Sequence, residues 1–346
     1  MKVIIQIPCY NEEATLPITL GALPRKLPGI ESVEWLIVDD GSTDRTADVA
    51  LAHGVDHLVR LPCNQGLAKS FMVGIEACLK AGADIIVNTD GDNQYCADDI
   101  PKLIQPILDD EAEMVIGARP IADIEHFSGL KKCLQKIGSW VVRLASKADI
   151  PDAPSGFRAI SREAAMRLNV FTEYTYTLET TIQAGRSGMA ITSVPIRTNE
   201  CLRPSRLVRS IPRYIHRSVM TILRIFITYR PFRFFAFQGV VSSGFGFLLG
   251  LRFLFFYFTG RGSGHIQSLI LAALLLGVGF FLIVAGVLAD LIAVNRKMLE
   301  DLKWRLWNLE KREPVEAEKK HKMLWNLSET YYSDAGKRES VRTSSE

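Results

Sequence analysis

The chain has 346 residues, of which 48% are hydrophobic and 23% charged, and its formal net charge is +3. This length allows one large domain or two modest ones. The six cysteines all lie within the first 201 residues and form no CxxC pair, which excludes the usual zinc patterns and favours a reducing, cytosolic compartment. The apolar run at residues 1–8 is too short for a signal peptide and is expected to form a first strand.

Short apolar runs alternate with helical stretches over residues 1–120. The predicted strands are residues 3–7, 35–38, 85–88 and 114–116. The predicted helices between them are residues 12–23, 44–53, 66–81 and 98–109. This alternation predicts an α/β domain with a doubly wound, mostly parallel sheet over residues 1–204, with a further strand at 190–196.

A basic stretch follows at residues 205–230. Five arginines recur at helical spacing, on one face of a predicted amphipathic helix: Arg206, Arg209, Arg213, Arg217 and Arg224. No Asp or Glu occurs between Glu200 and Asp290, whereas ten arginines do. Such a helix suits an anionic membrane surface, although a solvated face or a nucleic-acid-binding patch has the same pattern.

Two apolar segments come next, and they favour the membrane. Residues 234–258 are apolar except for Gln238, a few serines and Arg252, and residues 267–289 carry no charge. Each is long enough to cross a hydrocarbon core, and the short loop between them predicts a hairpin. Basic residues flank the pair, which predicts that the catalytic domain, the tail at 296–346 and both termini face the cytoplasm. The end of the tail is expected to be disordered.

Two carboxylates and an amide follow the third predicted strand. Asp90, Asp92 and Gln94 would lie at the carboxyl edge of the sheet, where open α/β sheets bind ligands. Three oxygen donors at this spacing suit Mg²⁺ or Mn²⁺. A polar loop whose aspartates cap a turn is the alternative.

Polar segments also follow the first two strands, at residues 8–13 and 38–44. Asn11 and Glu12 suit the start of a helix, and Asp39 and Asp40 could hold the base and ribose of a nucleoside. The chain has no GxGxxG after its first strand and no GxxxxGK[ST], so neither a dinucleotide fold nor a P-loop is supported.

The ordered segments PCYNEE, VDDGSTD, NTDGDNQ, IGAR and PSGFRAISR resemble a family 2 glycosyltransferase with the GT-A fold. The closer resemblance is to the branch that makes polyprenyl-phosphate or dolichyl-phosphate mannose or glucose. It covers residues 1 to about 210, and the hairpin resembles the membrane anchor of several members. The QxxRW segment of sugar-polymer synthases is absent, which disfavours chain extension.

The resemblance implies a site. A nucleotide sugar would be bound by Pro8, Tyr10, Asn11, Glu12, Asp39, Asp40, Lys69, Asp90 and Gly91. Mg²⁺ or Mn²⁺ would be bound by Asp90, Asp92 and Gln94, where a divalent ion would stabilise the departing diphosphate. Arg119 and Arg206 would contact phosphate, and Asp152 matches the acidic residue on the acceptor side.

We therefore expect a membrane-anchored inverting hexosyltransferase that moves one hexose from UDP- or GDP-hexose to polyprenyl or dolichyl phosphate at the cytoplasmic face. Such an acceptor is already ionised, so Asp152 could orient a substrate instead of acting as a base. Two alternatives stay open: transfer to another membrane acceptor, such as a glycolipid or a protein, and a catalytically silent membrane scaffold. The expected partners are the nucleotide sugar, the lipid phosphate and the bilayer, without nucleic acid, and the glycines of the spans are compatible with a homo-oligomer.

Overall fold

The computed structural model describes residues 1–120, 150–170, 176–199, 220, 224, 227, 231–260, 266–310 and 323–326. The chain divides into two compact units. The first comprises Met1–Tyr214 and Lys303–Glu346, and the second comprises Ile215–Leu302. The predicted helix at 205–230 falls mostly outside the described residues, where only Met220, Arg224 and Ile227 are seen, each in helical conformation.

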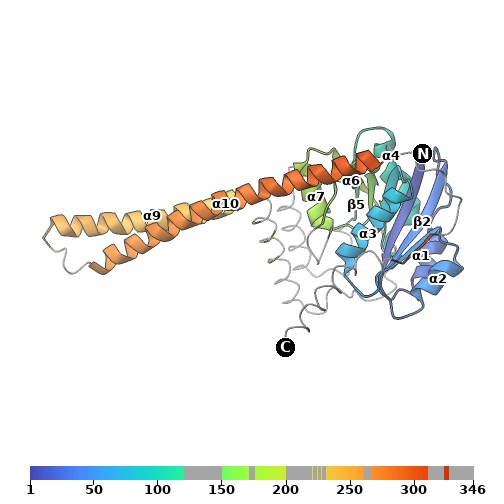
Figure 1. Ribbon diagram of the computed structural model, residues 1–346, viewed down its shortest axis with the longest axis horizontal. Coiled ribbons are helices and arrows are strands. Elements are labelled where there is room, and N and C mark those ends of the chain that lie inside the picture. Colours follow the sequence, from blue (N-terminus) through green and yellow to red (C-terminus); the bar gives the residue numbers. More distant parts are fainter. Residues whose placement is uncertain are drawn as a thin grey trace, which may run out of the picture. The chain divides into compact units, whose positions relative to one another are not determined.

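A single mixed sheet forms the centre of the first unit, in the order β7-β5-β6-β4-β1-β2-β3-β8 (Figure 1). Its strands are β1 (Lys2–Cys9), β2 (Ser32–Asp39), β3 (His57–Arg60), β4 (Ile85–Asn88), β5 (Met114–Ala118), β6 (Arg158–Ser161), β7 (Ile191–Pro195) and β8 (Met323–Asn326). Strand β6 is antiparallel to both β4 and β5, whereas the other neighbours pair in parallel. The carboxyl ends of β1, β2, β4 and β5 therefore lie at one edge of the sheet.

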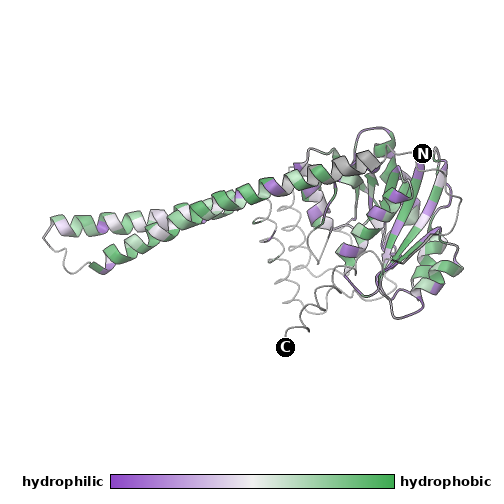
Figure 2. Ribbon diagram, in the orientation of Figure 1, coloured by the Kyte–Doolittle hydropathy of each residue, from purple (hydrophilic) through white to green (hydrophobic). Residues whose placement is uncertain are grey.

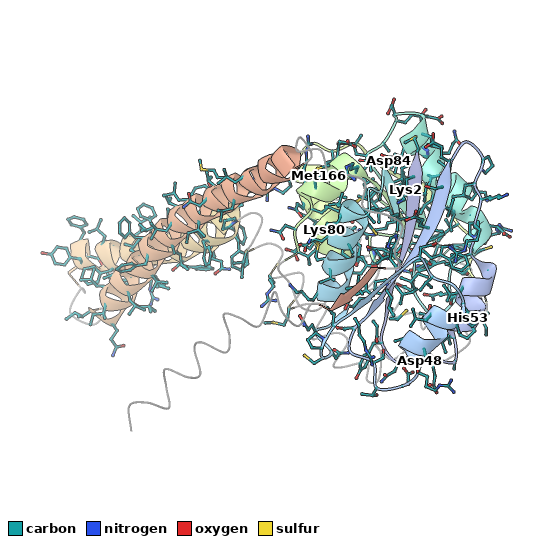
Figure 3. The ribbon with its side chains drawn as sticks, turned by 45° about the vertical axis from the view of Figure 1, so that its right-hand side comes forward. Lys2, Asp48, His53, Lys80, Asp84 and Met166 are labelled. Atoms are coloured by element: carbon teal, nitrogen blue, oxygen red, sulfur yellow. The ribbon has the colours of Figure 1, made fainter. Side chains whose placement is uncertain are left out.

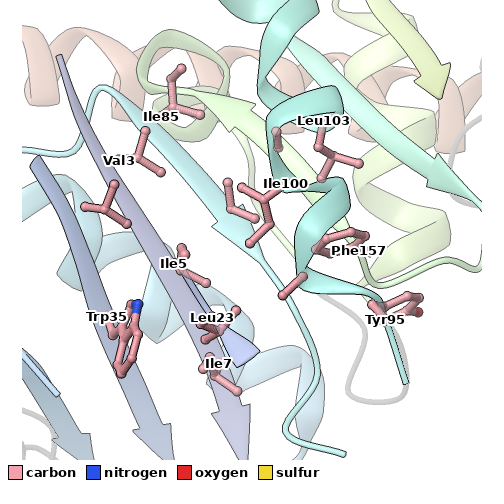
Figure 4. Packing of buried hydrophobic residues seen from close by; sticks show 14 of the residues in the cluster. Val3, Ile5, Ile7, Leu23, Trp35, Ile85, Tyr95, Ile100, Leu103 and Phe157 are labelled. Carbon is pink, nitrogen blue, oxygen red and sulfur yellow. The ribbon is translucent and has the colours of Figure 1, made fainter. Parts of the chain in front are cut away.

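Helices cover both faces of this sheet. On one face, α1 (Leu16–Ala22), α2 (Thr46–Ala52) and α4 (Ile100–Leu108) pack on alternate strand residues such as Val3, Ile5 and Ile7 (Figure 4). On the other face, α3 (Leu67–Lys80) contacts β1 and β2, and α6 (Arg162–Arg167) contacts α3. Because the central strands are buried on both faces, they are nearly continuous apolar runs, as expected for parallel strands.

The edge of the sheet away from the carboxyl ends is fixed by Lys2 and Asp84, which lie close together in Figure 3. The backbone N–H of Lys2 donates to Asp84 Oδ2 at 2.8 Å, and the side-chain Nζ of Lys2 donates to the carbonyl of Ala81 at 2.9 Å. These contacts join the start of β1 to the turn before β4. They stabilise the register in which β1 pairs with β4, from Val3 with Ile85 to Gln6 with Asn88. This register determines where the carboxyl ends of the two strands lie relative to each other.

The fold class predicted from the sequence is confirmed: a mostly parallel α/β sheet, followed along the chain by two long apolar helices. The four strands expected within residues 1–120 coincide with β1, β2, β4 and β5, and the expected strand at 190–196 is β7. Three short strands were not predicted. These are β3, which follows α2, β8 in the tail, and β6, whose buried sequence Arg-Ala-Ile-Ser opens with a charged residue.

The second unit contains two long helices, α9 (Pro231–Phe258) and the first part of α10 (Ile266–Glu310). Each is long and apolar enough to cross a membrane, over Pro231–Phe258 and Ile266–Asn295. Only 11% and 17% of their most apolar windows are buried, so these helices differ from the core helices of a soluble protein. Hydrophobic residues dominate both stretches in Figure 2. The domain boundaries proposed within this region remain predictions.

Candidate active site

Nearly all of the site residues predicted from the sequence lie where β1, β2, β4 and β5 end. Pro8 belongs to the end of β1, and Asp39 is the last residue of β2. Asp90 follows β4 closely, and Arg119 comes directly after β5. Since β6 is antiparallel, the segment before it, which carries Asp152, starts from the same edge. The sheet topology thus brings together five segments that are distant in sequence.

The loops after β1 and β2 are joined by hydrogen bonds. Asn11, whose φ is +55°, receives a hydrogen bond from the backbone N–H of Thr43 at 2.8 Å, and its own N–H donates to Ser42 Oγ at 2.9 Å. Glu12 is buried, and its Oε2 accepts from Thr15 Oγ1 at 2.7 Å. Asn11 and Glu12 therefore hold the shape of this corner, as their helix-start pattern suggested. Tyr10, beside them, is exposed.

The two aspartates at the end of β2 have different surroundings. Both oxygens of Asp40 accept backbone hydrogen bonds, from Gln65 at 2.8 Å and Gly66 at 2.9 Å, which fixes the start of α3. Burial raises the pKa of Asp40, and these two N–H groups oppose that rise. Asp39 is fully buried; its Oδ1 accepts from Ser42, whereas Oδ2 has only Arg60 Nε at 3.3 Å. Among the described residues no hydrogen bond reaches Asp39 Oδ2, so the protein leaves the acceptor capacity of this buried oxygen unused.

The loop after β4 carries the predicted metal ligands. Gly91 is buried against the first corner: a Cβ at this position would lie 3.1 Å from Cys9 Sγ and 3.4 Å from Glu12 Cγ. Asp92 Oδ1 accepts from the backbone N–H of Gln94 at 3.2 Å, which closes a turn around Asn93, whose φ is +56°. Asp92 therefore does what the capping alternative expects, and its other oxygen is not used in this turn.

The donor set of this loop fits a hard divalent ion. Asp90, Asp92 and Gln94 are each partly exposed and supply two carboxylates and one amide. No group of three His, Cys, Asp or Glu side chains that could hold a metal exists among the residues that the structure describes. Two carboxylates are nevertheless the usual protein share for Mg²⁺, which keeps water and substrate phosphate oxygens as its other ligands. The chemistry of these residues thus suits a metal that is completed by a diphosphate.

Arg119 and Asp152 form a buried ion pair. Arg119 Nε donates to Asp152 Oδ2 at 2.7 Å and Nη2 donates to Oδ1 at 3.0 Å, a bidentate arrangement. The Arg119 backbone N–H also donates to Oδ2, at 3.2 Å. The side chain of Asp152 is inaccessible and that of Arg119 is 10% exposed. The two residues predicted as separate catalytic groups therefore act as one unit in this structure.

Gly156 connects this pair to the loop of the predicted metal ligands. Its carbonyl accepts from Asn88 Nδ2 at 2.7 Å, and its N–H donates to the hydroxyl of Tyr95 at 2.9 Å. A Cβ on Gly156 would lie 3.1 Å from both carboxylate oxygens of Asp90. Two hydrogen bonds, one from Asn88 and one to Tyr95, thus connect the segment that carries Asp152 to the segment that carries Asp90.

Sequence reasoning missed the polar groups beneath this contact. Arg158 is fully buried and donates to the carbonyls of Ala153 at 2.6 Å and Ser155 at 2.8 Å, and to two threonine hydroxyls of α7 (Thr177–Arg186). Burial lowers the pKa of Arg158 to about 10, so the guanidinium remains charged at neutral pH. Arg158 thus fixes the loop that carries Asp152. The signal in the sequence was a charged or amide residue at a strand end, as at Arg158 and Asn88.

Lys69 and Arg206 are the two remaining predicted residues. Lys69 is exposed in the first turn of α3. Arg206 lies outside the described residues, and so do the other basic residues of the 200–219 segment. Their assignment to phosphate contacts stays a prediction.

Residues 197–199 hold the other side of the loop that follows β4. Asn199 Nδ2 donates to the carbonyls of Asn93 and Tyr95, and Arg197 donates to the buried carboxylate of Asp99. Burial would raise the pKa of Asp99, but hydrogen bonds from Arg197 and Lys102 prevail and lower it to about 2.

We expect this carboxylate to make the protein sensitive to acid. A pKa below the unfolded value contributes stability above about pH 4, and that contribution is lost as the pH falls toward 2. Because Arg197 and Lys102 are more than half exposed, solvent screening should limit the loss to about 1 kcal/mol. Urea unfolding between pH 5 and 3 should show a smaller loss of stability in Asp99→Asn than in the unchanged chain. An equal slope in the two proteins would contradict this assignment.

A family model described as glycosyl transferase family 2 matches residues 4–168. An undecaprenyl-phosphate mannosyltransferase of Micrococcus luteus is 30% identical over 206 residues, which make up 57% of this chain and 83% of that protein. A UDP-N-acetylglucosamine–dolichyl-phosphate N-acetylglucosaminyltransferase of Methanococcus voltae is 30% identical over 217 residues, 56% of this chain and 83% of that protein.

Among solved structures, glucosyl-3-phosphoglycerate synthase of Mycobacterium tuberculosis is similar with a TM-score of 0.51 at 20% identity, over 64% of this chain and 79% of that one. This likeness shows the fold, a mostly parallel α/β sheet of the GT-A type. The family model and the relatives show that the protein is a glycosyltransferase. The chain belongs to glycosyl transferase family 2.

Proposed function

We propose that this glycosyltransferase transfers one hexose from a nucleotide sugar, UDP- or GDP-linked, to a polyprenyl or dolichyl phosphate. The observation that carries the proposal is the joining of two loops through Gly156: one bears Asp90, Asp92 and Gln94, and the other bears Asp152 paired with Arg119. A cluster that suits a diphosphate and its metal thus adjoins a buried cation that suits a second phosphate. Names of two relatives support the acceptor, since both act on a polyprenyl-type phosphate while their sugars differ.

In the proposed reaction an oxygen of the acceptor phosphate attacks the anomeric carbon, and the bond from that carbon to the diphosphate breaks. The nucleoside diphosphate leaves with the electron pair, and the anomeric configuration inverts. Asp90, Asp92 and Gln94 would hold Mg²⁺ or Mn²⁺, which supplies positive charge to the leaving diphosphate. Asp39 and the corner at residues 8–12 would hold the nucleoside. Gly91, which has no side chain, would let the backbone approach the nucleotide sugar closely.

Asp152 orients rather than deprotonates in this proposal. Both of its oxygens already bind Arg119, so accepting a proton would disrupt a buried ion pair. A phosphate acceptor is ionised at neutral pH and needs no base. Arg119, held in a fixed orientation, is then available to the acceptor phosphate through its remaining donors, and Arg206 and Lys69 would add charge nearby.

The two apolar helices would anchor the enzyme in the membrane that contains its acceptor, with the catalytic unit and both termini on the cytoplasmic side. The basic stretch at 205–230 supports this orientation, because cytoplasmic flanks of membrane spans carry an excess of Arg and Lys.

The test is direct. Purified protein in detergent is incubated with polyprenyl phosphate, Mn²⁺ and a panel of radiolabelled UDP- and GDP-sugars, and the lipid is extracted. We expect label in the lipid from one donor, dependent on the metal and released by mild acid. Absence of labelled lipid with every donor would defeat the proposal, and label in diacylglycerol or protein instead would favour another membrane acceptor.

A further inference from the structure

The register between α9 and α10 defines which residues lie at the same level of the hairpin. Gly239 faces Gly279 so closely that a Cβ would lie 2.8 Å from its carbonyl oxygen. Nearer the loop, Ser242 Oγ donates to the carbonyl of Leu275 at 2.9 Å, and Gly246 lies against the carbonyl of Ala272. These contacts continue an antiparallel register that places Arg252 opposite the first turn of α10.

The charged residues of the two helices lie at matching levels in this register. Arg233 and Arg252 are 19 positions apart on α9, with no charged residue between them. At about 1.5 Å per residue they are separated by roughly 28 Å, close to the ~30 Å thickness of a hydrocarbon core. Gly286 of α10 packs against Phe232 and Phe235, near the level of Arg233, and α10 carries no charge before Asp290. The uncharged segments of the two helices therefore coincide.

Arg252 lacks an acidic partner in the hairpin. No Asp or Glu occurs between Glu200 and Asp290, and Asp290 lies near the other end of the apolar span Ile266–Asn295. Arg252 is exposed, and its guanidinium carbon lies 5.9 Å from the ring centroid of Phe256, one turn closer to the loop. The guanidinium thus lies beside an aromatic ring near the loop end of the span, where a basic residue can reach the interface.

Aromatic side chains surround the end of α9 beyond Arg252. Phe255, Tyr257 and Phe258 are 66%, 62% and 78% exposed. Aromatic residues at such a position are typical of the region between hydrocarbon and headgroups. Taken together, these residues place Arg252 at the depth of the lipid phosphates in the leaflet at the loop end of the hairpin.

We propose that Arg252 binds the phosphate of a membrane phospholipid in that leaflet, and that this contact fixes the depth of the hairpin. The proposal rests on the membrane anchoring put forward above and concerns a lipid distinct from the acceptor. A planar guanidinium donates two parallel hydrogen bonds to a phosphodiester, which a neutral side chain cannot do. Without this charge the apolar stretch of α9 would extend to its last turn, and the helix could move deeper or tilt.

The experiment measures depth, not catalysis. The full chain carrying Thr259→Cys is reconstituted in phosphatidylcholine vesicles, and the rate of labelling by a membrane-impermeant maleimide is recorded after subtracting the chain without this cysteine. We expect Arg252→Leu to slow labelling at least about fivefold, and Arg252→Lys, which keeps the charge, to slow it less than twofold. Equal rates for Arg252 and Arg252→Leu would overturn the proposal.

Two further arms identify the ligand. In vesicles of galactosyl diacylglycerols, which have no phosphate, labelling of the unchanged chain should fall to the rate of Arg252→Leu. If labelling stays fast in these vesicles, the position of Arg252 depends only on hydration, and the proposal of a phosphate contact is wrong. If the effect of Arg252→Leu disappears when the protein is diluted in lipid, a second copy supplies the partner, which also overturns the proposal. Asp92→Asn should leave every labelling rate unchanged, so failure here is distinguishable from failure of the proposed transfer reaction.

Discussion

Replacing Asp92 with asparagine is expected to lower the rate of sugar transfer about a hundred- to a thousandfold while leaving the fold intact. Asparagine keeps an oxygen that can accept the Gln94 N–H, so the turn after β4 should survive. What is lost is one of the two negative charges that suit a divalent ion, and with it the stabilisation of the leaving diphosphate. The measurement is the initial rate of lipid labelling at saturating donor, together with Mn²⁺ affinity from electron paramagnetic resonance.

The matched control for this change is Asp98→Asn. Asp98 lies in the short 3-10 helix Ala97–Asp99 that follows this loop, and its replacement removes the same charge. Its side chain is 82% exposed, and its ion pair with Arg197 is long, at 3.8 Å. Its variant should keep the rate within about twofold. If Asp92→Asn retains both metal affinity and turnover, the loop is only a capped turn and the site lies elsewhere.

Replacing Asp152 with asparagine is expected to cost about 3–5 kcal/mol of stability, because it leaves the buried guanidinium of Arg119 without its counter-charge. Transfer should become slower rather than cease, since a phosphate acceptor needs no base. Unfolding by urea in detergent gives the first quantity, and the pH profile of the rate gives the second. Abolished activity in Asp152→Asn, together with an acidic limb in the pH profile of the unchanged chain, would instead identify a base and a hydroxyl acceptor.

A second variant keeps this test informative if Asp152→Asn fails to fold. In the double change Asp152→Asn with Arg119→Met, the unpaired charge is gone, and much of the lost stability should return. Transfer should nevertheless stay low, because the cation proposed to meet the acceptor phosphate is missing. Recovery of both stability and rate would show that the pair has only a structural role.

Four of the five strands in the first 120 residues were predictable, because strands buried on both faces are almost uninterrupted apolar runs; the short β3 was not. These four strands end in polar segments, and parallel topology requires those segments to meet. Asp39, Asp90 and Arg119 could therefore be grouped from the sequence. What periodicity could not reveal was β6. Its four residues begin with Arg158, whose charge is accommodated by carbonyls and hydroxyls from elements far along the chain.

The partnerships of the site residues were equally hidden. Asp152 and Arg119 were both identified as candidates, yet their ion pair joins positions 33 residues apart and depends on the antiparallel turn into β6. Asp40 was expected to face the nucleoside, and the structure shows it fixing the start of α3. Such contacts depend on tertiary placement, which local sequence patterns do not encode.

Gly156 limits how this enzyme could be re-engineered. Donor and acceptor segments of a transferase are often treated as separate modules, each exchangeable for that of a relative. Here Gly156, in the loop before β6, is bound to the loop after β4. Tyr95 and Asn88 hold its N–H and its carbonyl, and a Cβ added to it would meet Asp90. Grafting residues 152–157 alone would leave two buried polar groups mismatched. A change of acceptor is therefore expected to succeed only when residues 88–95 are exchanged along with it.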